Sequence, residues 1–447
     1  AYSDAQERSL LAVSAISGTA PETIFVRTWN SNEYYYVRIR SSNGEFSLDE
    51  PFRLEIEADG SDCSRVSSLS ELSGDQPLTP AGNPTTLIVY DSSRLYLVEG
   101  SDQIDLVAKL SQLAAVVDGQ LLDVNNDRRV QAANLQADEY PQCPYAKNVV
   151  AEAIKEIIDG YRTLDDSNLQ YVVFVGGDVV IPFFRHPDNA DLARESQFVP
   201  PVRDDSASQA ALRLGYILSQ DFYIAEKEVA LTNNTFPIPA AGLSAGRLVE
   251  TAAEISAVID AFITGGGPLQ PQSALVTGYD FLEDAALEIR DQLAAGIGNT
   301  PDQLITPFDV PPTGPDAWTA SQLRDALLTK RHDVIFLAGH FSGHSALAAD
   351  YTTELFAAEV AESAVDLTNS LIFSIGCHAG YNIVNQHEVP EIERNPDWAQ
   401  AFARKGATLV AGTGYQYGET LTKEYSERLY IEFSKQLRRD TGAPVSR

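Results

Sequence analysis

The pattern of hydrophobic positions changes near residue 82. Between residues 22 and 58, three segments carry an apolar residue at every second position, and turn-forming residues separate them. This period of two predicts a small antiparallel β module. Residues 59–84 are rich in Ser, Gly and Pro, which is the composition of a linker or a long surface loop. We therefore assign residues 1–82 to an N-terminal β module with its linker.

Beyond this linker, short continuous apolar runs alternate with segments whose apolar residues recur at helical spacing. The runs that predict buried strands are 85–91, 171–177, 273–279, 333–339, 370–376 and 407–413. The segments that predict helices are 104–118, 147–162, 252–264, 282–296, 319–330, 396–406 and 422–439. Strands that are apolar on both faces, each followed by a helix, indicate a parallel sheet covered on both sides. We predict the α/β class with two adjacent doubly wound, mainly parallel sheets flanked by helices, one in residues 83–265 and one in residues 266–447.

The charge of the chain argues against one class of partner. Its 63 acidic residues outnumber its 32 basic residues, which gives a formal net charge of −31. Nucleic acid is not an expected partner, because phosphate binding needs a basic surface. A solvated acidic surface suits a protein that works outside the cell or at high salt, and it leaves room for a structural calcium ion. No apolar run approaches the roughly 20 residues of a membrane helix, and we expect a secreted or cell-surface protein.

The ends of the sequence and its cysteines fit a processed, secreted chain. The sequence begins at Ala1 with a polar segment, and its last residues follow directly on a predicted helix. We therefore expect a propeptide or a C-terminal continuation. Cys63 and Cys143 lie in polar, turn-rich surroundings that suit a disulfide, with two free thiols as an equal alternative. Cys377 is then the odd thiol, which in a secreted protein is a candidate reactive group.

Two segments in the second half place reactive side chains directly after predicted strands. The run 333–339 leads into His340, and the run 370–376 leads into Cys377, each with a glycine before the reactive residue. Catalytic groups gather at the carboxyl ends of strands in open parallel sheets. A cysteine attacks a carbonyl group as a thiolate, and imidazole is its usual base. We predict Cys377 as a nucleophile and His340 as its general base, with His344 as an alternative base.

The backbone beside this pair offers hydrogen-bond donors for a developing oxyanion. Gly339 and Gly376 allow a substrate to approach the chain closely, and N–H groups around Gly339 and Cys377 are the candidate donors. Phe341 follows the histidine directly and helps to shape the same wall.

Histidine is concentrated in this region, since five of the six histidines lie between residues 332 and 387. If the segment were helical, His340 and His344 would share one face as metal ligands, with Cys377 or His378 as a third. The segment follows a strand and contains Gly and Ser, so we favour a loop without a metal. His344 and His378 then take supporting or surface positions.

A second metal motif fails on its spacing. Asp123, Asn125 and Asp127 have the spacing of an EF-hand loop, but Arg128 stands where that loop needs Gly and Asn134 where it needs Glu. We interpret this segment as a surface turn. Calcium remains a candidate structural ion elsewhere, and no cofactor is required.

The strand-end motifs resemble those of the caspase-like cysteine peptidases, and in particular the gingipain family. Residues 171–184 are similar to the family's strand and turn that end in Asp-x-x-Ile-Pro, and residues 245–263 to its Gly-Arg strand end and following helix. The resemblance covers about residues 85–435. It implies two caspase-like subdomains, the second of which carries the dyad, and an endopeptidase that acts on proteins or peptides through a thioester.

The resemblance also implies a substrate pocket, and it has one departure. Arginine-specific gingipains line the S1 pocket with an aspartate near a helix start, which points to Asp284, or to Asp280, and to cleavage after Arg or Lys. A helix-start position favoured by the dipole is the alternative for Asp284. Glycine usually follows the histidine in the family, whereas Phe341 stands here. This departure motivates a rival hypothesis, a catalytically silent scaffold in a cell-surface or extracellular assembly.

Overall fold

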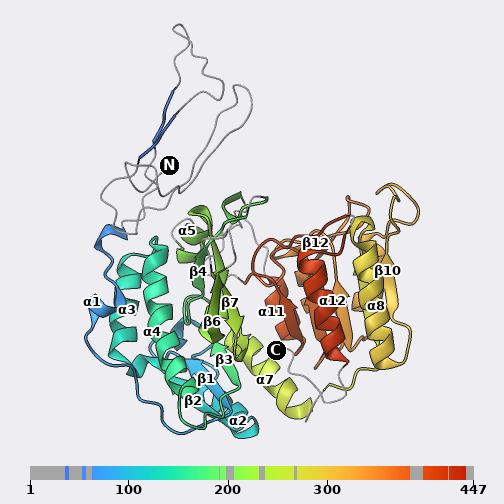
Figure 1. The fold of residues 1–447 in the computed structure, drawn as a ribbon. Helices are drawn as coiled ribbons and strands as arrows, with labels where there is room; N and C mark the ends of the chain where they lie inside the picture. The colour runs from blue at the N-terminus through green and yellow to red at the C-terminus, as the bar shows by residue number, and fades with distance from the viewer. Residues whose placement is uncertain are drawn as a thin grey trace, which may run out of the picture. The chain divides into compact units, whose positions relative to one another are not determined.

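The computed structural model (Figure 1) describes residues 36–39, 53–56, 63–190, 192–197, 206–230, 237–265, 269–382, 396–420 and 422–438. The chain consists of two compact units, Ala1–Val66 and Ser67–Arg447. The predicted N-terminal β module lies outside the described residues, apart from 36–39 and 53–56. No helix among the described residues is long and apolar enough to cross a membrane.

The first sheet of the second unit has four strands in the order β2-β1-β3-β8, and all neighbouring pairs are parallel. Its strands are β1 (Thr86–Tyr90), β2 (Gly119–Asp123), β3 (Tyr171–Val175) and β8 (Ser244–Leu248). The helices of this half are α1 (Leu69–Leu72), α2 (Leu106–Val116), α3 (Arg128–Glu139), α4 (Pro144–Arg162), α5 (Ala207–Arg213), α6 (Asp221–Ile224) and α7 (Ala252–Gly265). Two antiparallel pairs accompany them, β4 (Phe184–Pro187) with β5 (Tyr216–Ser219) and β6 (Ala225–Ala230) with β7 (Pro237–Ala241).

The second sheet has five strands in the order β10-β9-β11-β14-β15, and it is parallel throughout. Its strands are β9 (Ala274–Gly278), β10 (Asp302–Ile305), β11 (Val334–Leu337), β14 (Leu371–Ser374) and β15 (Thr408–Ala411). The helices of this half are α8 (Glu283–Ile297), α9 (Ala320–Leu328), α10 (Ala357–Glu362), α11 (Trp398–Arg404) and α12 (Tyr425–Leu437). A small antiparallel pair, β12 (Ser345–Leu347) with β13 (Glu354–Phe356), completes it.

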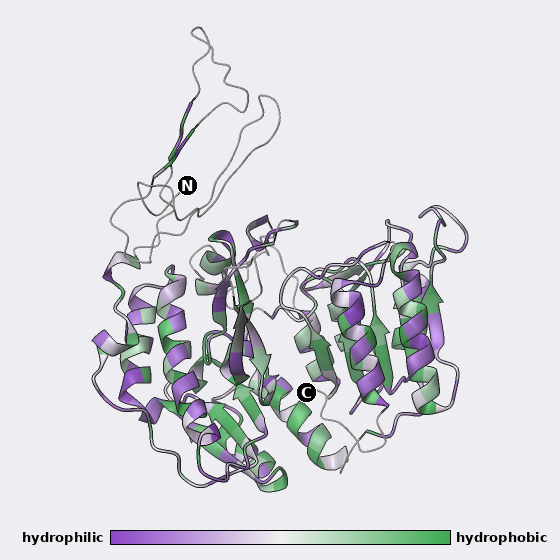
Figure 2. Cartoon of the chain, viewed as in Figure 1, coloured by the Kyte–Doolittle hydropathy of each residue, from purple (hydrophilic) through white to green (hydrophobic). Residues whose placement is uncertain are grey.

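Both faces of the second sheet are covered, because side chains along its strands alternate between two cores. One core holds Leu275, Ile335 and Ile372 of the strands together with Leu323, Val360 and Phe402 of α9, α10 and α11. The other core holds Val276, Phe336 and Phe373 together with Ile289 of α8 and Tyr430 of α12. Figure 2 shows the strands of both sheets as mainly hydrophobic, while the helices have one polar side. The predicted α/β class with two parallel, helix-covered sheets is confirmed.

The strands that the hydrophobic pattern misses lie at sheet edges or in small pairs. β2 and β10 are edge strands that pair with one neighbour each, and the first two residues of β10 are exposed. An edge strand needs no continuous apolar run, since one side of it faces solvent or a loop. The short antiparallel pairs lack a distinctive pattern for the same reason.

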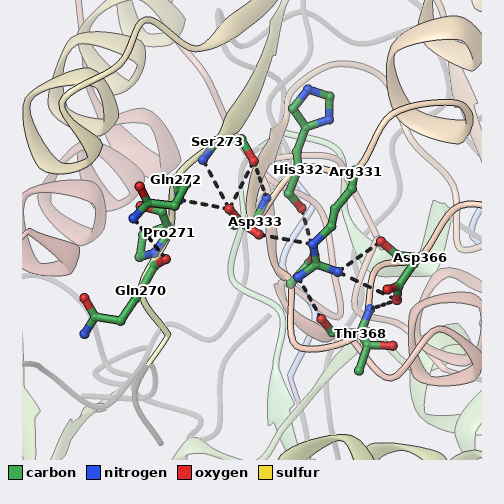
Figure 3. Close-up of polar contacts among 10 residues, drawn as sticks. Gln270, Pro271, Gln272, Ser273, Arg331, His332, Asp333, Asp366 and Thr368 are labelled. Carbon is green, nitrogen blue, oxygen red and sulfur yellow. Dashed lines mark hydrogen bonds and ion pairs between the residues drawn. The ribbon is translucent and has the colours of Figure 1, made fainter.

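A polar cluster (Figure 3) lies directly before β9, β11 and β14, at the amino edge of the second sheet. His340 and Cys377 follow β11 and β14 at the opposite edge. The Asp333 carboxylate accepts hydrogen bonds from the Gln272 N–H at 2.9 Å and from the Ser273 N–H and hydroxyl at 3.2 and 3.1 Å. The Arg331 side chain binds Asp333 and the carbonyl oxygens of Asp366 and Thr368 before β14. Burial alone would raise the pKa of Asp333, but these hydrogen bonds and the Arg331 charge hold the pKa below its usual range.

We expect Asp333→Ala to lower the free energy of unfolding at neutral pH by about 2 kcal/mol, as is typical of hydrogen bonds to a charged acceptor. Because the folded pKa is lowered, the carboxylate stabilises the fold above its unfolded pKa of about 4. This contribution is lost as pH falls through the folded pKa. Urea unfolding at pH 7 and at pH 3 measures the difference from wild type, which should be smaller at pH 3. The exposed Asp291→Ala is the control, and an equal difference at both pH values would contradict the prediction.

Candidate active site

His340 reaches the carboxyl edge of the second sheet through a glycine turn after β11. Gly339 has a φ of +148°, and a Cβ at this position would collide with the Tyr279 ring. Both conditions favour glycine. The His340 carbonyl then accepts a hydrogen bond from the Leu347 N–H at 2.9 Å, so a short hairpin fixes the chain beyond the turn.

Three aromatic rings surround the His340 imidazole. The ring centroids of Tyr279, Phe281 and Tyr351 lie 5.2, 5.4 and 5.5 Å from its centroid. Although the residue as a whole is exposed, this partial burial lowers the pKa of the imidazole, and the Asp280 carboxylate acts in the opposite direction. The neutral imidazole, which is the form that accepts a proton, is thereby favoured.

Cys377 lies at the same edge because β14 is the parallel neighbour of β11. Leu337 pairs with Ser374, and His340 and Cys377 each follow three residues after these partners. The Ser374 hydroxyl donates to the Leu337 carbonyl at 3.0 Å, and the Gly376 N–H donates to the same hydroxyl at 3.0 Å. The ends of the two strands are therefore tied together next to both reactive side chains.

The Cys377 thiol is half-buried and rests against a third loop. Its Sγ donates to the carbonyl of Gln416 at 3.5 Å. Burial raises the pKa of the thiol, and the Glu195 carboxylate acts in the same direction. Within the described part of the chain, the thiol and the His340 imidazole share no hydrogen bond. Such bonds are often long without a substrate and tighten in the complex.

Two backbone N–H groups of the His340 and Cys377 loops, those of Phe341 and Cys377, donate to no other described residue. In the bridge between Phe341 and Ala346, the hydrogen bonds come from the flanking Leu347 and Ser342 N–H groups, so the Phe341 N–H points away from the hairpin. The Cys377 N–H also donates to no other described residue. These two donors are suited to an oxyanion, whereas Gly339 and Gly376 serve to shape the chain.

The Phe341 side chain fits against the glycine that precedes the cysteine. Its ring packs on Trp398 with centroids 5.5 Å apart. A Cβ on Gly376 would overlap with the Phe341 ring. The bulky residue after the histidine is thus accommodated by the missing side chain at Gly376.

The other predicted site residues are divided between several places. Asp280 follows β9, and its charge acts on His340. Asp284 is exposed in the first turn of α8, and its charge acts on the buried Glu427 of α12. His344 is buried directly before β12. His378 is buried and pairs with Glu195 at 2.8 Å, so it is not a surface residue.

The metal hypotheses find no supporting cluster in the residues that the structure describes. No group of three or more His, Cys, Asp or Glu side chains there is arranged to hold a metal ion. Asp123 and Asp127 instead cap the 3-10 helix Val124–Asn126 and the helix α3 that follow them, and Asp127 and Asn134 are buried. The prediction of a surface turn for this segment is therefore wrong. His332 lies at the opposite edge of the sheet, where it bonds to Asp302 at 2.9 Å. Histidine clustering in the sequence therefore does not mean clustering in space.

The cysteines differ in state. Cys63 and Cys143 are both disulfide-bonded, and Cys377 is free. The odd thiol is therefore the one that lies at the carboxyl edge of the second sheet.

Several residues around the dyad are not predicted from the sequence. Tyr279 and Phe281 follow the buried strand β9, and the strand order places them beside β11. Knowledge of that order is the signal that would have found them. Glu195 lies in the 3-10 helix Glu195–Gln197 and Gln416 in a loop, both far from Cys377 in sequence, and no local pattern marks either of them.

Comparison with known proteins finds similar folds at low identity. No protein-family profile and no curated protein matches the sequence. Similar solved structures include the Arg-specific cysteine proteinase gingipain R (RgpB), with 14% identity, a TM-score of 0.45, and coverage of 81% of this chain and 68% of the other. The complex of Porphyromonas gingivalis RgpB pro- and mature domains is 14% identical, with a TM-score of 0.47 and coverage of 80% of this chain and 69% of the other. A further protease structure is 12% identical, with a TM-score of 0.42 and coverage of 74% of this chain and 60% of the other. Values this low say nothing of activity, and the family resemblance stays a prediction.

We expect Gly376→Ala to lower the free energy of unfolding by about 1–3 kcal/mol, because the new methyl group overlaps with the Phe341 ring. The double variant Gly376→Ala/Phe341→Ala should recover part of this loss, since the ring is then absent. Thermal unfolding of the single and double variants measures the coupling. Gly343→Ala, two residues after Phe341, is the control, since a Cβ on Gly343 would meet only ordinary contacts. Losses that simply add in the double variant would contradict this packing.

Proposed function

We propose that the chain is a cysteine endopeptidase in which Cys377 is the nucleophile and His340 the general base. The observation that supports it most is the pairing of β11 with β14, which brings both side chains to one edge of the sheet. The N–H groups of Phe341 and Cys377, which donate to no other described residue, support the second requirement of acyl transfer, a place for the oxyanion.

The reaction starts from a neutral pair in this proposal. His340 takes the proton as the sulfur of Cys377 bonds to the substrate carbonyl carbon, and the carbonyl oxygen receives the negative charge between the two N–H groups. The tetrahedral species collapses to a thioester as the C–N bond breaks, and His340 gives its proton to the leaving amine. Water, with its proton taken by His340, then hydrolyses the thioester and restores the thiol. This chemistry requires no cofactor, and calcium is proposed as a structural ion alone.

The pH profile tests the neutral pair. The lowered pKa of His340 puts the acid limb of kcat/KM below about pH 6.5, because activity needs a neutral base. The raised pKa of Cys377 puts the alkaline limb above about pH 8.5, because the proton for the leaving amine must start on sulfur. We expect a broad plateau between these limits. Alkylation of Cys377 by iodoacetamide that stays fast at pH 5 would indicate a stable thiolate and overturn this mechanism.

The dyad itself is tested by substitution. Cys377→Ala and His340→Ala should each lower turnover of a fluorogenic peptide library by several orders of magnitude, because each removes a member of the reacting pair. His344→Ala is the matched control, since it removes the alternative base of similar spacing, and it should retain activity if it folds. Activity lost in His344→Ala but retained in His340→Ala would exchange the roles of the two histidines.

Cleavage after Arg or Lys is proposed through Asp284, with Asp280 acting on the base. Asp284 supports this role as an exposed carboxylate near the start of α8. We expect Asp284→Asn to reduce the preference for Arg and Lys at P1 about tenfold or more, because a charge-assisted bond is lost. Asp280→Asn should instead move the acid limb of the pH profile to lower pH, since it removes the charge that favours the imidazolium. P1 libraries and pH profiles of both variants separate the roles, and exchanged effects would reassign them.

A catalytically silent scaffold is the second candidate function. It is favoured by the contact of the thiol with Gln416 in place of His340. Rapid alkylation of Cys377 near neutral pH that depends on His340 would argue against it. In either case we propose a secreted or cell-surface location, and a propeptide as partner, because the acidic composition and the motifs fit both.

A further inference from the structure

A buried hydrogen bond joins the residue after Cys377 to the other half of the second unit. His378 Nε2 lies 2.8 Å from a carboxylate oxygen of Glu195, and the two residues are 1% and 3% exposed. Glu195 begins the 3-10 helix Glu195–Gln197 in the first half. Burying a carboxylate is costly unless it is well paired, so this contact is specific.

The second oxygen of Glu195 holds the loop that carries the hydrogen-bond acceptor of the thiol. It accepts the Tyr415 N–H at 2.7 Å. Gly414 makes room for it, because a Cβ there would collide with the same oxygen. Gln416, the next residue after Tyr415, receives the hydrogen bond from the Cys377 thiol. One carboxylate therefore binds both the loop that carries the Cys377 sulfur and the loop that accepts its hydrogen bond.

The two loops are also bound to each other around this carboxylate. The His378 N–H donates to the Gly414 carbonyl at 2.9 Å, and the imidazole packs edge-on against the Tyr415 ring with centroids 4.6 Å apart. His378 has a φ of +57°, a conformation that costs energy for a residue other than glycine. The surrounding contacts hold this conformation, and it sets the direction in which the chain leaves Cys377.

We propose that Glu195 is a positioning residue that fixes the nucleophile of the second half from the first half. This inference rests on the proposed peptidase function. Glu195 acts through His378 and Tyr415 on the geometry of the Cys377 loop and does not touch the substrate. Its negative charge opposes thiolate formation, so a contribution through charge alone would work against the nucleophile. The length of the Glu195 side chain, which lets it bind both His378 and Tyr415, is therefore the property that positions the Cys377 loop.

Two conservative variants separate reach from charge. Glu195→Gln keeps the length and one acceptor oxygen for the Tyr415 N–H, while its amide N–H can donate to Nε2 of a neutral His378 and its charge is removed. Glu195→Asp keeps the charge but shortens the side chain. If Glu195 acts by positioning the loop, the kcat of Glu195→Gln should stay within about threefold of wild type. Glu195→Asp should lose about tenfold or more in kcat with little change in KM, because small displacements of a reacting group are costly. Both variants fold if their thermal unfolding midpoints stay close to wild type.

Alkylation of Cys377 by iodoacetamide across the pH range gives a readout independent of peptide turnover. The titratable groups around the thiol are Glu195, His378, Tyr415 and Tyr417, and His340 lies at the same edge of the sheet. Removal of the Glu195 charge should move the alkylation profile to lower pH in Glu195→Gln. Glu195→Asp should keep the wild-type profile position while its turnover falls.

Arg404→Ala is the matched control for contact between the halves. Arg404 of α11 pairs with Glu254 of α7 at 2.7 Å, and we expect its loss to leave kcat within about threefold of wild type. Full activity in Glu195→Asp, a larger loss in Glu195→Gln than in Glu195→Asp, or an equal loss in Arg404→Ala would each overturn the positioning role. Wild-type protein without His340-dependent alkylation of Cys377 would instead refute the proposed function.

Discussion

The parallel pairing of β11 with β14 is the constraint on which the candidate site depends. Parallel neighbours end at the same edge, so whatever follows Leu337 and Ser374 is brought together whether or not the sequences are alike. Two buried cores hold these strands from both faces. The reactive pair can therefore sit on short loops and still be placed by the rigid part of the molecule, which is where precision is available.

The charges near the dyad act on different stages of the proposed reaction. Burial favours neutral Cys377 and neutral His340 at rest. Once sulfur has bonded to carbon, it carries no charge to be disfavoured, and the imidazolium then gains from the Asp280 carboxylate. The nearby carboxylates thus destabilise a free Cys377 thiolate but stabilise the protonated His340. Such an arrangement favours proton transfer that is coupled to attack over proton transfer that precedes it.

The sequence predicts the central strands and the candidate residues that follow them, but not the contacts that cross between distant segments. Strands such as β11 and β14 are buried on both faces, so they appear as continuous apolar runs, and the residues after them are found at once. β2 and β10 lie at edges and leave no such run. Glu195 contacts His378, the residue after Cys377, across the interface of the two halves, and this contact is visible only in the folded chain. Of the two positions predicted for His378, supporting or surface, the structure excludes the surface one.

The fit between Phe341 and Gly376 has a consequence for how the sequence can drift over time. A side chain at residue 376 is excluded while the ring stands beside it, but the ring tolerates removal whenever glycine is present. Change in this pair therefore has a direction: the large residue must shrink first, and only afterwards can the small one grow. Lineages that share the ring should share the glycine, while those that have lost the ring are free at both positions, so the pair records the order of past replacements.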